Sequence, residues 1–230
     1  RIEESLMLQE LLDSKTLSIK DFKLSIKEGY NYNVSDETIE SVIKNLNFEF
    51  IKKNKNIVTL ENERIIRHPD FTSLLQDINF TQFLRDSIQY SIYTFTKNYS
   101  KSSFTAGFIL HNKYSRKDVC RVLNWDKDIS STVYGYRTNK GSTPCFVTYH
   151  KGDDIEGSID YNDHFVSPSV FAWESRSNRR IASTEIQNVI QSERVLLFIK
   201  KADSEGTEFY YMGDVEIIPE SIEQGEMKDT

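Results

Sequence analysis

The chain has 230 residues, of which 38% are hydrophobic and 28% charged, and its 14 Phe, 12 Tyr and 2 Trp supply enough apolar mass for a folded core. No apolar run approaches the ~18 residues of a membrane span, no signal peptide is evident, and two cysteines are too few for a disulfide scaffold or a four-ligand zinc site, so we expect a cytoplasmic protein without membrane contact. The net charge of −6 is unevenly spread: residues 101–201 carry 15 Lys/Arg against 11 Asp/Glu, and residues 202–230 carry 1 against 9.

Residues 1–100 are predicted to be mostly helical, because apolar residues recur at the spacing of short amphipathic helices. The two first groups are Leu6, Leu8, Leu11 and Leu12, followed by Phe22, Leu24 and Ile26. Ser35 is predicted to start the next helix, and residues 57–60 to form a short strand. Two helices and a small hairpin are typical of a winged-helix-like module, and an ordinary helical connector is the alternative.

A further helical stretch is predicted for residues 71–99, and the polar run Lys97–Ser103 is the best candidate for a domain boundary. We therefore divide the chain into a helical connector domain (1–100), a second domain (101–220) and an acidic tail (221–230). Because residue 1 is Arg rather than Met, we expect the chain to be a segment of a longer protein.

The second domain is predicted to consist mainly of strands. Ser115 and Asp118 form a capping-box pattern that opens a helix over Arg116–Leu123, and a second helix is predicted for Ser183–Gln191. The predicted strands are Thr132–Arg137, Cys145–His150, Val170–Trp173, Val195–Lys200 and Phe209–Ile218. Two helices against five short strands predict an α+β fold with a partly closed β-barrel.

One motif raises the possibility of catalysis. His111, Lys113 and Asp118 fit the H-x-K-x4-D spacing of phospholipase-D-type phosphodiesterases, in which a histidine attacks phosphorus and a lysine neutralises its oxygens. A complete site needs two such motifs, and the chain holds one. Asp118 is better explained as a helix-start residue, so a phosphodiesterase is the alternative rather than the main hypothesis.

The sequence gives little support for a metal site or for nucleotide hydrolysis. Cys120 and Cys145 have no ligand spacing with His150 or His164, and small buried residues are the simpler interpretation. The chain has no Walker-type phosphate loop and no G-x-S-x-G nucleophile elbow. We therefore expect no metal and no cofactor, and no enzyme activity in this segment.

The composition of residues 171–180 favours binding. Phe171 and Trp173 share one face of a strand, and the polar run that follows suits a loop that clamps phosphates, although a solvated loop after a core strand is the alternative. The run contains Ser175, Arg176, Ser177, Asn178, Arg179 and Arg180.

A second group of candidates lies earlier in the same domain. Tyr134 and Tyr136, separated by a glycine, can form a flat wall for a base, and for Tyr134 a place in the core is preferred. Arg137 and Lys140 lie on a predicted turn. Arg116 and Lys117 lie at a predicted helix N-terminus, where phosphate is attracted.

Several ordered motifs together resemble one known family. They are Tyr114–Trp125, Val133–Tyr136, Phe146–Lys151, Trp173–Arg176 and Phe209–Gly213. This set is similar to the conserved C-terminal domain that follows DEAD/DEAH-box helicase cores in bacteria, best understood in SauUSI-type modification-dependent (type IV) restriction endonucleases. The resemblance covers about residues 105–218.

The resemblance implies an SRA-like, PUA-related barrel that binds double-stranded DNA containing 5-methylcytosine or 5-hydroxymethylcytosine and flips the modified base. The partners it implies are the helicase and nuclease domains of the same full-length protein. From residue chemistry, we expect Trp173, Tyr136 and Ser175 to form the pocket for the base. The residues expected on the DNA backbone are Arg116, Lys117, Arg137, Lys140, Arg176, Ser177, Asn178 and Arg179.

A carboxylate is expected to accept a hydrogen bond from the cytosine amino group, and Asp153, Asp154 and Asp163 are equal candidates. A third class of function is a protein-docking module of a helicase that uses the acidic tail.

Overall fold

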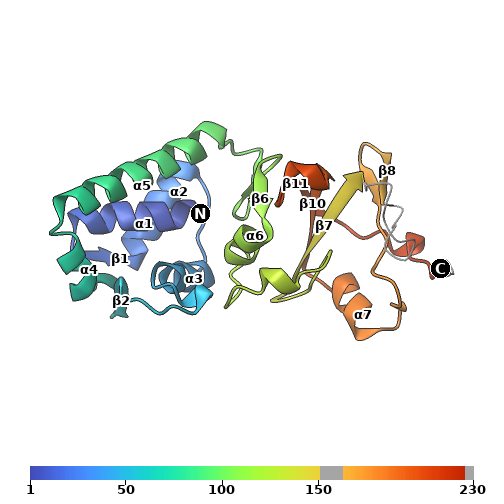
Figure 1. The fold of residues 1–230 in the computed structure, drawn as a ribbon, viewed down its shortest axis with the longest axis horizontal. Coiled ribbons are helices and arrows are strands. Elements are labelled where there is room, and N and C mark those ends of the chain that lie inside the picture. Colours follow the sequence, from blue (N-terminus) through green and yellow to red (C-terminus); the bar gives the residue numbers. More distant parts are fainter. Residues whose placement is uncertain (151–162, 226–230) are drawn as a thin grey trace. The chain divides into compact units, whose positions relative to one another are not determined.

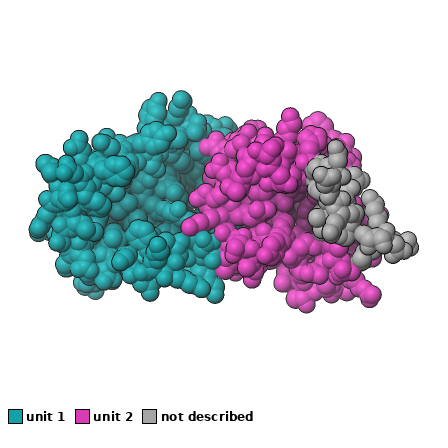
Figure 2. Space-filling view, in the orientation of Figure 1, with its two compact units in different colours: residues 1–109, 120–128 teal, residues 110–119, 129–230 magenta. Residues whose placement is uncertain are grey.

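The computed structural model describes residues 1–150 and 163–225, which form two compact units (Figure 2). Unit 1 holds residues 1–109 and 120–128, and unit 2 holds residues 110–119 and the described part of 129–230. Residues 101–109 and 120–128, which follow the boundary predicted at residue 100, thus pack with unit 1. Both units combine helices with strands, so the predicted α+β class is confirmed, and the sheets of the described residues are open rather than closed into a barrel.

Unit 1 begins with three helices (Figure 1) and a three-stranded antiparallel sheet in the order β1-β3-β2. The elements are α1 (Ile2–Asp13), β1 (Thr16–Ser18), α2 (Ile19–Tyr30), α3 (Asp36–Leu46), β2 (Val58–Glu61) and β3 (Arg64–Arg67). The predicted order of helices followed by a hairpin is confirmed, and β1 is an additional strand.

The rest of unit 1 is a helical pair and a small hairpin, namely α4 (Pro69–Leu74), α5 (Ile78–Asn98), β4 (Phe104–Thr105) and β5 (Phe108–Ile109). The single helical stretch predicted for residues 71–99 is therefore interrupted. Asp77 causes the interruption, because its carboxylate accepts hydrogen bonds from the backbone N–H groups of Asn79 and Phe80 and so starts a new helix.

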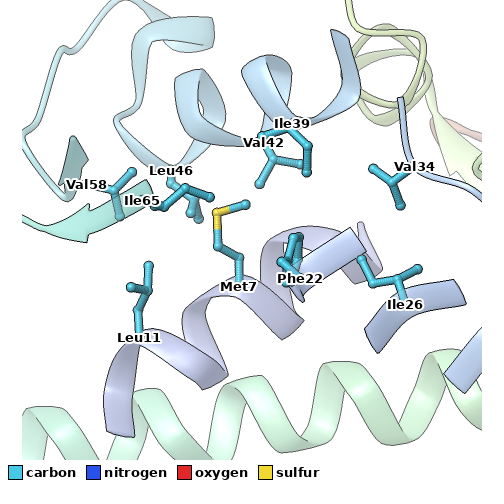
Figure 3. Packing of buried hydrophobic residues seen from close by; sticks show 10 residues of the cluster. All are labelled: Met7, Leu11, Phe22, Ile26, Val34, Ile39, Val42, Leu46, Val58 and Ile65. Carbon is cyan, nitrogen blue, oxygen red and sulfur yellow. The ribbon is translucent and has the colours of Figure 1, made fainter. Parts of the chain in front are cut away.

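The core of unit 1 lies between α1, α2, α3 and the sheet. Figure 3 shows Met7 and Leu11 of α1 among side chains from α3 and the strands, and both are fully buried. Ser35 caps α3 as predicted, with its hydroxyl accepting from the N–H of Thr38 at 3.1 Å. The buried carboxylate of Glu4 accepts a hydrogen bond from Asn45 at 2.8 Å and pairs with Arg121.

Unit 2 is built on a four-stranded sheet in the order β6-β11-β10-β7, with a separate hairpin β8–β9. Its strands are β6 (Lys113–Ser115), β7 (Ser142–His150), β8 (His164–Ser167), β9 (Val170–Ala172), β10 (Arg194–Ala202) and β11 (Glu208–Val215). Its helices are α6 (Arg116–Val122), which ends in unit 1, and α7 (Thr184–Ile190), with 3-10 turns at Ser130–Thr132, Asp203–Glu205 and Pro219–Ser221.

The sheet of unit 2 has two distinct faces, because side chains alternate along each strand. β10 pairs with β11 antiparallel and with β7 parallel, and a bulge in the β10–β11 ladder lies at Leu197/Phe198. We call one side the phenyl face, which carries Phe146, Phe198, Phe209 and Tyr211, with neighbouring rings 5.1–5.2 Å apart. We call the other side the cavity face, which carries Val147, Tyr149, Leu197, Ile199 and Tyr210.

Most elements predicted for this part of the chain form, with ends shifted by one to three residues, but two predictions are wrong. Residues 132–137 are not a strand, because Gly135 has φ +77° and turns the chain, leaving Tyr136 in one isolated bridge to Cys145. Tyr134 is 66% exposed rather than part of the core. Strand β8 was not predicted, and Asp153 and Asp154 lie outside the described residues.

Within residues 1–150 and 163–225, none of the helices has both the length and the apolar composition needed to cross a bilayer.

Candidate functional site

A cavity of about 510 Å³ opens on the cavity face of unit 2, a size common among ligand-binding pockets. Three aromatic rings and two apolar side chains make up most of its lining. The full lining is His111, Tyr149, Phe165, Ile199, Lys201, Tyr210 and Met212. These residues come from β7, β8, β10, β11 and the segment before β6, so the cavity needs both the four-stranded sheet and the β8–β9 hairpin.

The strand ladders position the aromatic walls. Ile199 of β10 pairs with Tyr210 of β11 and with Val147 of β7, which places Tyr149, two residues further on, on the same side. Phe165 comes from β8, with its ring 6.1 Å from the ring of Tyr149. Phe171 of β9 supports Phe165 from the paired strand, edge to face at 4.9 Å.

Two cations lie on the cavity face. Lys201 lines the cavity and is exposed, and the ammonium of Lys113 lies 4.6 Å from the ring centre of Tyr210. The backbone N–H of His111 donates to Tyr211 at 2.8 Å, which holds the His111 segment alongside β11. Apolar walls with cations beside them suit a flat ring that carries an anionic group.

The structure places the predicted pocket residues in contact but leaves no slot between them. Tyr136 is 2% exposed, and its ring meets that of Trp173 edge to face at 5.0 Å and 84°. The Arg176 guanidinium lies 4.7 Å from the ring centre of Tyr136. The hydroxyl of Ser175 donates to the carbonyl of Arg176 at 3.4 Å. In this conformation no base can lie between Tyr136 and Trp173.

Two of the arginines predicted to bind phosphate form ion pairs with a carboxylate of the same unit. The Glu185 carboxylate accepts a hydrogen bond from Arg179 Nε at 2.6 Å and pairs with Arg176. Burial alone would raise the pKa of Glu185, but hydrogen bonds to its charged form hold that pKa below its ordinary value. Burial and the nearby Glu185 raise the pKa of Tyr136 to about 12. The cluster therefore stabilises the loop around residues 175–180.

The other predicted backbone contacts are scattered over unit 2. Arg137 is exposed and donates to the Thr132 hydroxyl at 2.8 Å, while Lys140 and Lys117 are exposed on a turn and on α6. Asn178 is exposed and Ser177 half-buried in the 175–180 loop. Arg116 is half-buried against the phenyl face. Asp163 accepts from the backbone N–H of Glu174 at 2.9 Å.

The H-x-K-x4-D residues have separate surroundings. His111 lines the cavity, Lys113 lies over Tyr210, and Asp118 is engaged by Ser115. The Ser115 hydroxyl lies 2.6 Å from the Asp118 carboxylate, and the N–H of Asp118 donates to that hydroxyl at 3.1 Å. This reciprocal geometry is the predicted capping box.

We expect Ser115→Ala and Asp118→Ala each to lower the free energy of unfolding by about 1 kcal/mol, because each removes one side of the capping box. The double variant should cost less than the two single changes combined, since both act on one motif. Urea unfolding followed by circular dichroism measures these values. An Asp118→Ala protein as stable as the wild type would contradict the capping role.

Both cysteines are buried thiols, and burial raises the pKa of Cys145 to about 12. Within the described part of the chain, no three His, Cys, Asp or Glu side chains gather in a way that could hold a metal ion.

Besides Ile199 and Lys201, the cavity residues that sequence analysis missed are Tyr149, Phe165, Tyr210 and Met212. Tyr149, Tyr210 and Met212 lie in predicted strands, where side chains two residues apart share a face. Tyr149 therefore shares a face with Val147, and Tyr210 was expected to share one with Met212. Phe165 carried no such signal, since its strand was not predicted.

Comparison with protein families divides the chain into two parts. Residues 108–230, more than half of the chain, match the model of a domain of unknown function, DUF3427. Residues 1–101 match that of a second domain of unknown function, DUF8090. No curated protein matches the chain.

Proposed function

We propose, for a chain that belongs to the DUF3427 family of domains of unknown function, a role in recognising double-stranded DNA that contains 5-methylcytosine or 5-hydroxymethylcytosine. In this proposal the chain is the non-enzymatic target-recognition segment of a cytoplasmic type IV restriction endonuclease. Its helicase and nuclease domains lie elsewhere in the same full-length protein.

The cavity of unit 2 is the observation that carries the proposal. Stacking a base on an aromatic side chain contributes roughly 1–3 kcal/mol, and flipping a base out of a duplex costs a few kcal/mol, so the aromatic walls can offset that cost. Tyr149, Phe165 and Tyr210 offer three such walls. Lys113 over Tyr210 and Lys201 in the lining supply charge for the adjacent phosphates.

The proposal extends to the fold of unit 2. We assign the four-stranded sheet and the β8–β9 hairpin to an SRA-like or PUA-like arrangement, a partly closed barrel with the cavity at its opening. The base pocket is reassigned from Tyr136 and Trp173 to the cavity, because the rings of Tyr136 and Trp173 are already in contact.

The residues of unit 1 fit a connector between domains better than a module that binds DNA. In a winged-helix module the third helix enters the groove, but α3 begins with Asp36 and Glu37, which repel phosphate. The same helix is engaged within unit 1, since Asn124 donates to Thr38 at 3.2 Å and Lys44 pairs with Asp126. We therefore place DNA recognition in unit 2.

The test is a fluorescence-anisotropy titration of the 230-residue chain with two duplexes that differ by one 5-methylcytosine, at about 150 mM salt. We expect the methylated duplex to bind roughly fourfold more tightly or better, because one buried methyl contributes about 0.8 kcal/mol. Equal affinity for both duplexes would refute the recognition of modified cytosine. Absence of binding to either would favour the docking module instead.

A further inference from the structure

Two basic side chains converge on the phenyl face of unit 2, on the opposite side of the sheet from the cavity. The guanidinium carbon of Arg116 lies 4.8 Å from the ring centre of Phe209, and the ammonium of Lys200 lies 5.0 Å from the same centre. Arg116 also lies 5.3 Å from the ring centre of Phe146. Two like charges are thus held around one phenyl ring.

Neither cation is in an ordinary surface position. The Lys200 side chain is 9% exposed, and its ammonium lies 2.6 Å from the Asp203 carboxylate and 3.2 Å from the carbonyl oxygen of Gly206. Nε of Arg116 is buried and has no hydrogen-bond partner among the described residues. A partly buried guanidinium whose Nε has no acceptor costs free energy, which an anion beside its charge would offset.

The charge of the Asp203 carboxylate acts on both cations, and Asp203 is more exposed than either of them. Its side chain is 73% exposed on the 3-10 turn between β10 and β11, and Thr148 Oγ1 lies 3.5 Å from it. Asp203 thus pairs with Lys200 and acts on Arg116 through its charge, so two cations share one exposed carboxylate. Burial lowers the pKa of Arg116 and the Asp203 charge opposes this, as expected for a cation short of counter-charge.

We propose that Arg116 and Lys200 form a phosphate-binding site, in which the Asp203 carboxylate occupies the phosphate position until a phosphate displaces it. A guanidinium stacked on aromatic rings presents its N–H donors in a fixed plane, and phosphate oxygens accept such donors in pairs. Lys200 supplies the second charge and Thr148 a hydroxyl donor. The phosphate belongs either to a nucleic-acid backbone or to a free phosphate compound.

The test is isothermal titration of the 230-residue chain with inorganic phosphate and, separately, with an unmodified DNA duplex. We expect Arg116→Gln to weaken phosphate binding about tenfold or more, because a charge-assisted hydrogen bond contributes roughly 1.5–3 kcal/mol. Asp203→Asn should tighten it several-fold, since the competing carboxylate loses its charge. Lys127→Gln, at an exposed lysine of unit 1, is the matched control and should change nothing.

If the Arg116→Gln protein does not fold, the Asp203→Asn variant still tests the proposal, because Asp203 is exposed and its substitution should leave the fold intact. A solely structural ion pair predicts that Asp203→Asn leaves phosphate affinity unchanged or lower, and that result would overturn the site. Binding of inorganic phosphate with unchanged duplex affinity in Arg116→Gln would identify a free phosphate compound as the ligand, whereas loss of duplex affinity would identify the DNA backbone. The methylated-to-unmethylated affinity ratio tests the function proposed above and is independent of these outcomes.

Discussion

We expect Tyr149→Ala to weaken binding of the methylated duplex roughly 5- to 150-fold, because loss of one aromatic wall removes about 1–3 kcal/mol of stacking. The effect should be larger for the methylated duplex than for the unmodified one, since only the flipped base enters the cavity. The measurement is the same anisotropy titration, made on both duplexes. Tyr134→Ala is the matched control, because Tyr134 is a tyrosine of the same unit, is 66% exposed and does not line the cavity.

The variant Trp173→Ala tests whether the base binds in the cavity or in the pocket predicted from the sequence. Trp173 packs on the cavity face against the cluster of Val147, Leu197 and Ile199 without lining the cavity, so its removal should reduce stability more than it alters the preference for methylated DNA. If Trp173→Ala abolishes the preference while Tyr149→Ala leaves it intact, the base pocket lies at Tyr136 and Trp173 after all.

The second prediction with a large effect concerns the stability of unit 2 and compares two neighbouring residues of β11. Phe209 is fully buried on the phenyl face, 5.2 Å from the ring of Phe146, whereas Tyr210 is 36% exposed on the cavity face. We expect Phe209→Ala to lower the free energy of unfolding of unit 2 by about 3–5 kcal/mol, because it leaves a cavity in a packed aromatic layer. Tyr210→Ala should cost about 1 kcal/mol or less in stability and act on DNA binding instead.

Tryptophan fluorescence can assign this loss to the correct unit. The chain has two tryptophans, Trp125 in unit 1 and Trp173 in unit 2, so a Trp125→Phe background leaves Trp173 as a reporter of unit 2 during urea unfolding. Similar stability losses for Phe209→Ala and Tyr210→Ala would show that the two faces are not packed as described.

Local signals in the sequence were sufficient for much of the fold. Ser35 and the pair Ser115 and Asp118 identify helix starts correctly, because capping depends on residues within one turn of each other. Alternating apolar residues likewise locate β10 and β11. The separation into α+β elements followed from the same short-range patterns.

The site depended on information that no local pattern contains. Tyr149 and Tyr210 meet around one cavity because β7 and β11 both pair with β10, and pairing partners are not evident from either strand alone. Tyr136 was misjudged for a similar reason. Its spacing from Tyr134 suggested one shared strand face, but the positive φ of Gly135 separates a buried ring from an exposed one.

The parallel pairing of β7 with β10 also governs how unit 2 must fold. Ser142 pairs with Arg194 and His150 with Ala202, so every contact of this ladder joins residues 52 positions apart in the chain. On the other side, Ser115 of β6 pairs with Glu208 of β11, which is more distant still. Chain segments this far apart lose much entropy when they meet, and domains dominated by such contacts fold in milliseconds to seconds rather than microseconds.

The hairpin of β10 and β11 is the local part of this sheet and can form early, but it exposes an unpaired β10 edge until β7 arrives. During synthesis β6 and β7 emerge well before β10 and β11, so neither of the early strands has its partner until the C-terminal part of the chain is made. Unit 2 therefore depends on its C-terminal third to complete the sheet, and a chain truncated before β10 is expected to remain unfolded in this region and prone to aggregation.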